Sequence, residues 1–187
     1  DIIIPSPSIP PSHIVFKEKK YIIGEIELAY QLYNLCKWIA ITGSNGKTTV
    51  VSILSKFFKY IVGNIGIPCS VLPKYIEYNF PIIAEISSYQ LSTIDKFKPS
   101  IAVILNINPN HLDYHGNFEN YKKSKFRITM NQESKDILIL PFSDWSINLK
   151  TKACKIYFNT NSTANCIYLN DDIVYVKESG IQNKLFI

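Results

Sequence analysis

The stretch that most constrains the fold is residues 38–50, which read Trp-Ile-Ala-Ile-Thr-Gly-Ser-Asn-Gly-Lys-Thr-Thr-Val. An apolar run leads into a glycine-bearing turn, and Lys47 and Thr48 then begin a segment of helical character. This order predicts a strand, a phosphate-binding loop and a helix, because Gly43 and Gly46 can adopt backbone angles at which amide groups converge on phosphate oxygens. Lys47 would neutralise phosphate charge, and the Thr48 hydroxyl would bind Mg²⁺. The general pattern has another glycine five residues before Gly46, where this chain has isoleucine, so the loop is a variant.

Apolar periodicity extends this unit into an α/β fold. Helical patterns cover residues 25–35, 47–61 and 118–131, and the second is apolar on most of its surface, as expected of a helix buried against a sheet. Apolar runs predict further strands at residues 80–86, 101–107 and 137–141. Alternation of strands and helices favours a mostly parallel sheet with helices on both faces. Short alternating runs at residues 155–158, 166–169 and 173–176 predict a small antiparallel appendage.

Composition sets the outer bounds. The chain has 187 residues, of which 47% are hydrophobic, enough for one large domain with its own core. It contains no run of about 18 apolar residues, so we expect no membrane span. Its net charge of +5 suits anionic ligands. The four cysteines lack paired spacing, so we expect reduced, packed thiols rather than a zinc site or disulfides. Because the chain opens with Asp1 in place of methionine, we expect it to be a segment of a longer protein.

Further motifs follow the phosphate loop in a fixed order. They are Gly-Asn-Ile-Gly at residues 63–66, Ala-Glu-Ile-Ser-Ser-Tyr-Gln-Leu at 84–91, Asn-Ile-Asn-Pro-Asn-His-Leu-Asp at 106–113 and Tyr-Lys-Lys-Ser-Lys-Phe-Arg-Ile at 121–128. Together with the loop they resemble the Mur ligase family, the ATP-dependent amide-bond-forming enzymes of peptidoglycan synthesis. The first two of these motifs are similar to the branch that adds D-glutamate to UDP-N-acetylmuramoyl-L-alanine. The resemblance covers roughly residues 1–150.

The resemblance implies a domain division and two departures from the family pattern. Residues 1–36 would be the tail of an N-terminal UDP-binding domain with its linker, and residues 37–187 the central ATP-binding domain, truncated at its C-terminal end. Residues 5–12, rich in proline, cannot be helical and read as an extended linker. The family usually has glycine where Ser8 stands, and commonly aspartate where Asn110 stands.

The resemblance also implies a set of site residues. ATP would contact Gly43, Ser44, Asn45, Gly46, Lys47, Thr48 and Thr49. The implied catalytic residues are Lys47, Glu85, His111 and Lys125. Two Mg²⁺ sites are implied, one held by Thr48 and Glu85 and the other by His111 with a carbamylated Lys125. The substrate would contact Asn64, Ser87 and Gln90.

The residues themselves leave alternatives open at two of these positions. Glu85 ends a predicted buried strand, where a carboxylate needs a nearby cation. Spacing alone does not separate Mg²⁺, shared with Thr48 and ATP phosphates, from a structural lysine or arginine. His111 follows the next strand, where a lone histidine is ordinarily a surface residue. By resemblance it would bind the second Mg²⁺ or contact the substrate carboxylate. His111 and His115 do not read as a helical zinc pair, because the glutamate of that motif is missing and a glycine follows.

Lys125 shares a helix face with the apolar residues Tyr121 and Ile128, whereas Lys123 and Arg127 point to the other side. One interpretation is a buried stem whose amine reaches solvent. The resemblance implies instead a carbamylated lysine. Carbon dioxide adds to a neutral amine, and burial favours the neutral form by lowering the pKa of lysine.

The expected function is therefore ATP-dependent ligation of D-glutamate to UDP-N-acetylmuramoyl-L-alanine through an acyl phosphate. A sister ligase is an alternative, which His-Leu-Asp-Tyr-His-Gly at residues 111–116 favours slightly. A catalytically incomplete ATP-binding fragment is another. The expected partners are UDP-N-acetylmuramoyl-L-alanine, D-glutamate and Mg·ATP, with no nucleic acid and no membrane. We expect a monomer in the cytoplasm.

Overall fold

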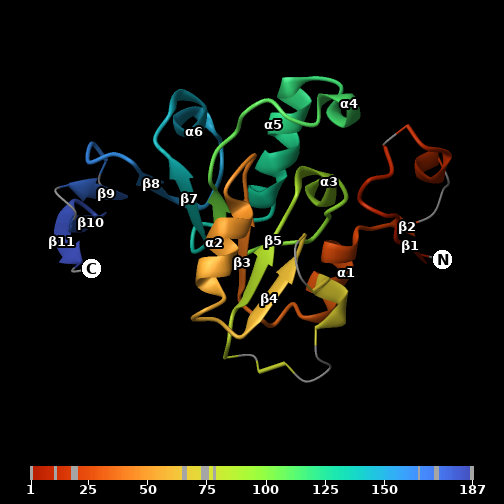
Figure 1. Cartoon of the computed structure of the whole chain (residues 1–187), viewed down its shortest axis with the longest axis horizontal. Coiled ribbons are helices and arrows are strands. Elements are labelled where there is room, and N and C mark those ends of the chain that lie inside the picture. The colour runs from red at the N-terminus through yellow and green to blue at the C-terminus, as the bar shows by residue number, and fades with distance from the viewer. Residues whose placement is uncertain are drawn as a thin grey trace.

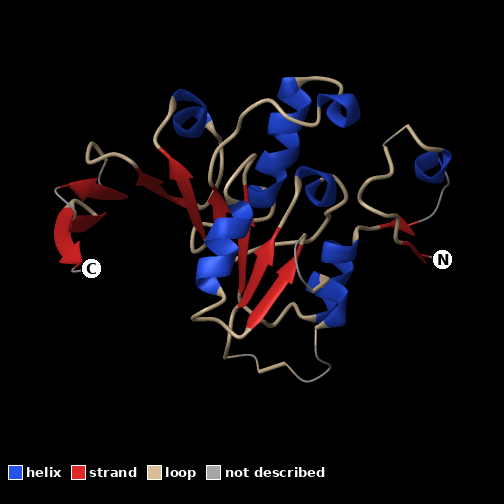
Figure 2. Ribbon diagram, in the orientation of Figure 1, coloured by secondary structure: helices blue, strands red, loops and turns tan. Residues whose placement is uncertain are grey.

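The computed structural model describes residues 2–10, 12–17, 21–64, 67–72, 76–77, 79–163, 165–170 and 173–185. Within these residues a nine-stranded sheet has the order β11-β10-β9-β8-β7-β6-β3-β5-β4, with helices packed around its centre (Figures 1 and 2). The strands are β3 Trp38–Thr42, β4 Tyr60–Gly63, β5 Ile82–Glu85, β6 Ile101–Ile104, β7 Ile137–Pro141, β8 Cys154–Phe158, β9 Cys166–Asn170, β10 Ile173–Glu178 and β11 Ile181–Leu185. The helices are α1 Glu25–Leu32, α2 Lys47–Leu54, α3 Ser88–Leu91, α4 Leu112–His115, α5 Phe118–Phe126 and α6 Asp144–Asn148.

Strand pairing confirms the mostly parallel sheet. The antiparallel part of the sheet begins later in the sequence than predicted. Strands β4, β5, β3, β6, β7 and β8 pair in parallel, and β9 also pairs with β8 in parallel. Only β9, β10 and β11 make antiparallel pairs within the described residues. The run at residues 155–158 was therefore wrongly assigned to the appendage. Its short alternating pattern fits either strand direction, so the sequence carried no signal for the pairing.

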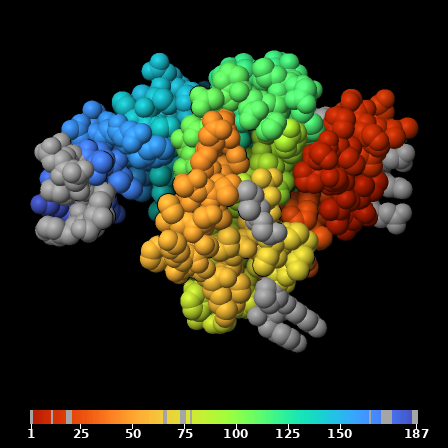
Figure 3. Space-filling model, viewed as in Figure 1, coloured from red at the N-terminus to blue at the C-terminus, as the bar shows by residue number. Residues whose placement is uncertain are grey.

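Side chains of the central strands alternate between the two faces of the sheet, and each face is covered by helices. Ile41 and Ile83 pack with Val51 of α2 on one face, while Ala40 belongs to a larger core on the other. That larger core includes Ile26 of α1 and apolar residues of α3 and α5. Figure 3 shows α2, in orange, covering the centre of the face in view. Helices on both faces are thereby confirmed.

The predicted helix over residues 47–61 is wrong in its second half. Helix α2 ends at Leu54, and residues 60–63 form β4, an edge strand that pairs in parallel with β5. Apolar residues continue past Leu54 at helical spacing, at Phe57, Phe58 and Ile61, and neither glycine nor proline separates the helix from the strand, so the sequence does not mark this boundary. The helix is also less buried than predicted, because Ile53 is 54% exposed and Phe57, just beyond its end, is 76% exposed.

Other elements match the prediction more closely. Helix α1 ends three residues earlier than predicted, and α5 continues as the 3-10 helix η3 Arg127–Thr129. Cys36, Cys69 and Cys166 are free and buried, whereas the free thiol of Cys154 is exposed and so departs from the expected packing. No helix in the described part of the chain is long and apolar enough to cross a membrane.

The N-terminal region forms a small sheet of its own and contacts helix α4. Strands β1 Ile2–Ile3 and β2 Tyr21–Ile22 form a small parallel pair, and the 3-10 helix η1 Ile14–Lys17 lies between them in sequence. The Tyr114 hydroxyl of α4 donates to the carbonyl of Ile9. The predicted linker is irregular at its described residues, as its prolines require. The domain division after residue 36 stays a prediction.

Gly63 ends β4 at a point where no side chain fits. Its φ is +116°, and a Cβ there would lie 2.1 Å from the carbonyl oxygen of Glu85 on the neighbouring strand. The next residue, Asn64, donates its amide to that same oxygen at 2.8 Å. The close approach of these two backbones therefore requires glycine.

We expect Gly63→Ala to lower the free energy of unfolding by about 3 kcal/mol, because it combines an unfavourable φ with a backbone clash. Gly180→Ala is the control, since Gly180 has a φ of +84° but no atom within 4 Å of the added Cβ. It should cost only about 1 kcal/mol, from backbone strain alone. Urea unfolding followed by circular dichroism measures both. Equal losses would contradict the close approach of β4 to β5.

Candidate active site

A cavity of about 210 Å³ lies at the carboxyl ends of the central parallel strands. Ligands of α/β proteins bind at this edge of the sheet. Its lining comes from the phosphate loop, from the segments after β4, β5 and β6, and from α5. The lining residues are Gly43, Ser44, Lys47, Asn64, Ser87, Ser88, Tyr89, His111, Tyr121 and Lys125. The fold thus brings together most of the predicted site residues.

The loop between β3 and α2 has the form expected of a phosphate cradle. Gly46 precedes the helix with a φ of +81°, which glycine adopts without strain. The amide of Val50 donates to the carbonyl of Gly46 and so closes the first helical turn. The amides of Lys47, Thr48 and Thr49 lie within that turn and have no acceptor inside the helix. These amides and the positive end of the helix dipole form an anion site.

The middle of the loop is held by the segment that follows β6. The amides of Ser44 and Asn45 donate to the carbonyl and side-chain oxygens of Asn106, at 3.0 and 2.9 Å. The Ser44 hydroxyl donates to the carbonyl of Asn108 at 2.9 Å and accepts from its amide at 2.8 Å. It also lies 2.9 Å from the Tyr121 hydroxyl. Ser44 and Asn45 therefore shape the loop through their amides, and direct ATP contacts by them stay a prediction.

Two lysine amines meet at the base of the loop. Lys47 Nζ donates to the carbonyls of Gly43 at 2.9 Å and Ser44 at 3.2 Å. Lys125 Nζ donates to the same Gly43 carbonyl at 2.9 Å and to Thr42 Oγ1 at 3.4 Å. Lys125 is only 2% exposed, so the interpretation in which its amine reaches solvent is wrong. The inward direction predicted from helical spacing agrees with this position.

Burial makes both amines easier to deprotonate. It lowers the pKa of Lys125 to about 7, with a further contribution from the nearby positive charge of Lys47. Burial also lowers the pKa of Lys47, while the negative charge of Glu85 opposes the change. The Lys125 ammonium, when charged, lies 4.9 Å from the centre of the Tyr121 ring. A neutral Lys125 amine is therefore well populated near neutral pH.

Glu85 is fully buried at the end of β5 and has one oxygen without a partner. Asn64 Nδ2 donates to its Oε1 at 3.1 Å, whereas Oε2 accepts no hydrogen bond from any described residue. No lysine or arginine in the described part of the chain forms an ion pair with Glu85. The alternative in which Glu85 pairs with a structural lysine or arginine is therefore not observed among the described residues. An orphaned buried carboxylate oxygen is what a bound cation would satisfy.

The donor set fits Mg²⁺ better than a transition metal. Among the described residues, no group of three or more histidine, cysteine, aspartate or glutamate side chains could hold a metal ion. Mg²⁺ is commonly bound by one or two carboxylates together with phosphate oxygens and water. Glu85 supplies a carboxylate, and Thr48 lies in the exposed first turn of α2 with a hydroxyl. That these two residues hold one ion together with a phosphate ligand stays a prediction.

Among His111, Ser87 and Gln90, the first two line the cavity and the third does not. His111 is exposed, has a φ of +52° and lies with its ring centre 4.9 Å from that of Tyr89. Ser87 lines the cavity, but Gln90 is buried and does not. Gln90 Oε1 accepts from the Ser87 amide at 2.9 Å and from its hydroxyl at 3.0 Å. Gln90 thus caps α3, and direct substrate contact by it stays a prediction. Ile65 and Gly66 of the Gly-Asn-Ile-Gly motif lie outside the described residues.

The cavity also contains Tyr89 and Tyr121, which the sequence did not single out as site residues. Ser88, expected with Ser87 on the loop that meets substrate, lines the cavity as well, and His115 Nε2 lies 3.0 Å from Ser88 Oγ. Burial lowers the pKa of His115, with further contributions from His111 and Lys125. The helical spacing that placed Tyr121 beside Lys125 was a usable signal. The packing of His115 against Ser88 joins segments that are distant in sequence, so the sequence contained no signal for this contact.

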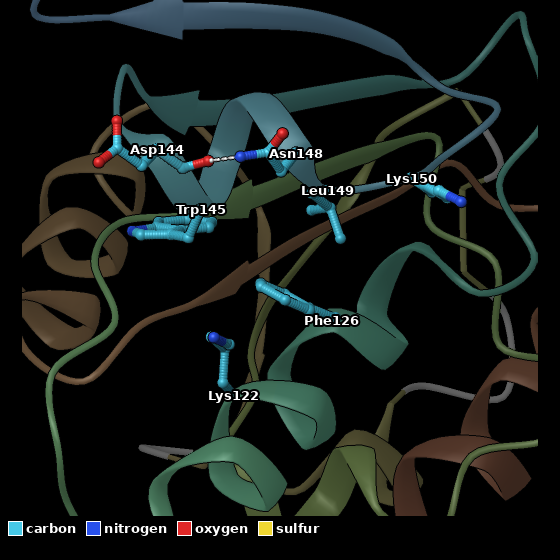
Figure 4. A pocket seen from close by; sticks show the side chains of 7 residues that line it. All are labelled: Lys122, Phe126, Asp144, Trp145, Asn148, Leu149 and Lys150. Carbon is cyan, nitrogen blue, oxygen red and sulfur yellow. Dashed lines mark hydrogen bonds between the residues drawn. The ribbon is translucent and has the colours of Figure 1, made fainter.

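A larger cavity of about 560 Å³ lies between α5 and the α6 segment. Figure 4 shows Phe126 and Lys122 on one side and Trp145 with Leu149 on the other. The Phe126 and Trp145 rings stack with centroids 5.7 Å apart. No predicted site residue lines this cavity.

The sequence matches a family model and named relatives. Residues 41–186 match the model of the Mur ligase middle domain. The chain is 40% identical over 200 residues to the UDP-N-acetylmuramoylalanine--D-glutamate ligase of Thermoanaerobacter sp. (strain X514), an alignment that covers 99% of this chain and 44% of the relative. It is 38% identical over 189 residues to the ligase of the same name from Clostridioides difficile (strain 630), covering 93% of this chain and 42% of the relative. The chain thus spans about two fifths of the length of these curated relatives.

A solved structure shares the fold. The MurF ligase from Thermotoga maritima, determined in complex with ADP, aligns with a TM-score of 0.56 at 15% identity. The alignment covers 98% of this chain and 54% of that one. At this identity the likeness concerns the fold alone.

The lowered pKa of Lys125 predicts a pH dependence of stability. Between about 7 and 10.5 the unfolded chain binds a proton on Lys125 that the folded chain lacks. The free energy of unfolding of the wild type should therefore rise with pH relative to that of Lys125→Met, by up to about 1.4 kcal/mol per pH unit. Urea unfolding at pH 7, 8 and 9 in buffer free of carbon dioxide measures the difference.

The exposed Lys123 on the same helix provides the control for this experiment. The difference between the wild type and Lys123→Met should stay constant over the same pH range. A constant difference for Lys125→Met as well would show that the pKa of Lys125 is not lowered.

Proposed function

Because the chain belongs to the Mur ligase family, we propose that it is the ATP-binding part of a ligase that joins D-glutamate to UDP-N-acetylmuramoyl-L-alanine. The relatives that carry this name match almost the whole chain. The observation that carries the proposal is the meeting, around one cavity, of a phosphate loop and two lysine amines, with the buried Glu85 carboxylate and its orphaned oxygen at the end of the neighbouring strand β5. In the same proposal, residues 1–36 end a UDP-binding domain and residues 37–187 belong to the central domain.

The phosphates of ATP would bind at the first turn of α2. The amides of Lys47, Thr48 and Thr49 point to this position, and the Lys47 amine already donates to two loop carbonyls that phosphate oxygens can replace. Phosphoryl transfer depends on charge neutralisation and alignment more than on covalent help from the protein. A lysine held by the loop supplies both.

Two Mg²⁺ ions are part of the proposal. Thr48 and Glu85 would hold the first, and the orphaned Glu85 oxygen supports this. His111 and a carbamylated Lys125 would hold the second, and both line the cavity. When bound, the ions would offset the charge of the transferring phosphoryl group.

The reaction would begin with attack of a substrate carboxylate oxygen on the γ-phosphorus, which breaks the bond to ADP and gives an acyl phosphate. The D-glutamate amine would then attack the acyl carbon, lose a proton and expel phosphate. Asn64 and Ser87 line the same cavity as Lys47 and would orient the carboxylate. Gln90 would act on it through Ser87, whose amide and hydroxyl it binds. A cavity of about 210 Å³ accommodates these reacting groups rather than the whole substrates.

A sister ligase remains the second candidate on sequence grounds, because of the His-Leu-Asp-Tyr-His-Gly stretch. The names of the relatives favour D-glutamate. A monomeric state and a cytoplasmic location belong to the proposal, and so does the absence of nucleic-acid and membrane partners.

We expect the chain to bind Mg·ATP weakly through its phosphates, and Lys47→Ala to abolish that binding. The reason is that Lys47 carries the positive charge of the loop, whereas the exposed Lys123 does not reach the cavity. Isothermal titration calorimetry compares the wild type, Lys47→Ala and Lys123→Ala. Equal affinity in the wild type and Lys47→Ala would remove the basis for the nucleotide site.

We expect Lys125 to react with carbon dioxide. Burial lowers its pKa to about 7, so that the neutral amine needed for carbamylation is present at physiological pH. Carbon-13 NMR of the chain in labelled bicarbonate should give a carbamate signal that grows when Mg·ATP is added. Lys125→Ala should lack the signal and Lys123→Ala should keep it. The same signal in both variants would assign carbamylation elsewhere.

A further inference from the structure

The segment that follows α3 is bound by a buried carboxylate from α1. Glu27 is fully buried. Its Oε2 accepts from the amides of Asp95 and Phe97, both at 2.9 Å, and its Oε1 accepts from the amide of Lys96 at 3.0 Å. Gln31 adds a fourth donor at 2.8 Å. A buried carboxylate is costly unless such donors satisfy it, so this contact is built specifically around residues 95–97.

A cation from the end of α5 binds the same segment from another side. Arg127 donates through Nε to the carbonyl of Leu91 at 2.8 Å and through Nη2 to that of Ile94 at 2.6 Å. The sequence placed Arg127 on the side of the helix opposite to Lys125. The structure shows it half-buried, with its guanidinium bound to the carbonyls at the end of α3. The Glu27 carboxylate thus accepts hydrogen bonds from the amides of this segment, and the Arg127 guanidinium donates to its carbonyls.

The start of α1 touches the segment as well. The amide of Gly24 donates to the carbonyl of Thr93 at 3.2 Å, and a Cβ on Gly24 would lie 2.2 Å from Thr93 Oγ1. Helix α3 itself is only four residues long and cannot be stable alone. Its N-cap Ser87 and its first residue Ser88 line the cavity. The position of this cavity wall therefore depends on what holds the far end of α3.

We propose that Glu27 and Arg127 are positioning residues of the cavity. By holding residues 91–97 from two sides, they fix α3, and with it Ser87 and Ser88, relative to the phosphate loop. Neither of them lines the cavity. The phosphate loop is held by a different set of contacts, from Asn106, Asn108 and Tyr121. A change at Glu27 or Arg127 should therefore alter the substrate side of the site and spare the nucleotide side.

Hydrogen exchange tests this on the 187-residue chain. Glu27→Gln keeps the size of the side chain but replaces one carboxylate oxygen with an NH₂ group. That group cannot accept a hydrogen bond from the amides of residues 95–97. Peptides covering residues 86–97 should exchange about tenfold faster, since a segment whose amides lack an acceptor opens more readily. Peptides covering residues 41–54 should be unchanged. Glu25→Gln is the matched control, because Glu25 lies on the same helix and accepts from the amide of Ser70 instead.

The kinetic test uses the full-length ligase and rests on the proposed function. Glu27→Gln and Arg127→Met should raise KM for UDP-N-acetylmuramoyl-L-alanine about tenfold, while KM for ATP stays near that of the wild type. A merely structural role would lower kcat with the active fraction and leave both KM values unchanged.

Each other outcome has one meaning. Unchanged exchange at residues 86–97, or faster exchange spread evenly over the chain, would overturn the positioning role. A full-length wild type that fails to turn over these substrates would overturn the proposed function alone, and the exchange data would still decide the positioning role.

Discussion

Two lysine amines, that of the buried Lys125 and that of the half-buried Lys47, donate to one carbonyl oxygen, that of Gly43, and the rest of the site follows from this crowding. Burial lowers the pKa of Lys125 to about 7, and repulsion between the two ammonium groups adds to this effect. The buried carboxylate of Glu85 lies near enough to favour the charged form of Lys47. The site thus combines two lysine amines with one orphaned carboxylate oxygen. A phosphate with its cation would satisfy both.

The surrounding fold holds these groups in place through backbone contacts that tolerate little change. A Cβ on Gly43 would lie 3.0 Å from the Leu105 Cβ, so the loop approaches the end of β6 closely. Gly63 allows β4 to approach the backbone of Glu85, and Asn64 then binds the carboxylate. The hydroxyl of Tyr121 joins α5 to the loop through Ser44. The geometry of the site thus comes from strand ends and helix starts, which a sheet of this kind brings to one edge.

Much of the fold and of the candidate site was predictable from the sequence, because strong local patterns indicated both. The strand, loop and helix around Lys47 follow from glycine spacing and apolar runs, and helical periodicity alone placed the Lys125 side chain inward. Strand β4 was missed because apolar residues continue at helical spacing from the helix into the strand, with no glycine or proline between them. The parallel pairing of β8 was missed because short alternating strands carry no sign of direction. The roles of Gln90 and Arg127 depend on partners that only the folded backbone supplies.

The central claim is that the orphaned oxygen of Glu85 and the Lys47 amine together bind a metal–phosphate ligand. The most direct measurement is a crystal structure of the chain with Mn²⁺ and a non-hydrolysable ATP analogue, in which anomalous scattering locates the ion. We expect an anomalous peak at an ion bound to Glu85 Oε2, with the Lys47 amine moved from the Gly43 carbonyl to a phosphate oxygen. Phosphates bound away from the start of α2, or a Glu85 Oε2 that contacts no ion, would contradict it.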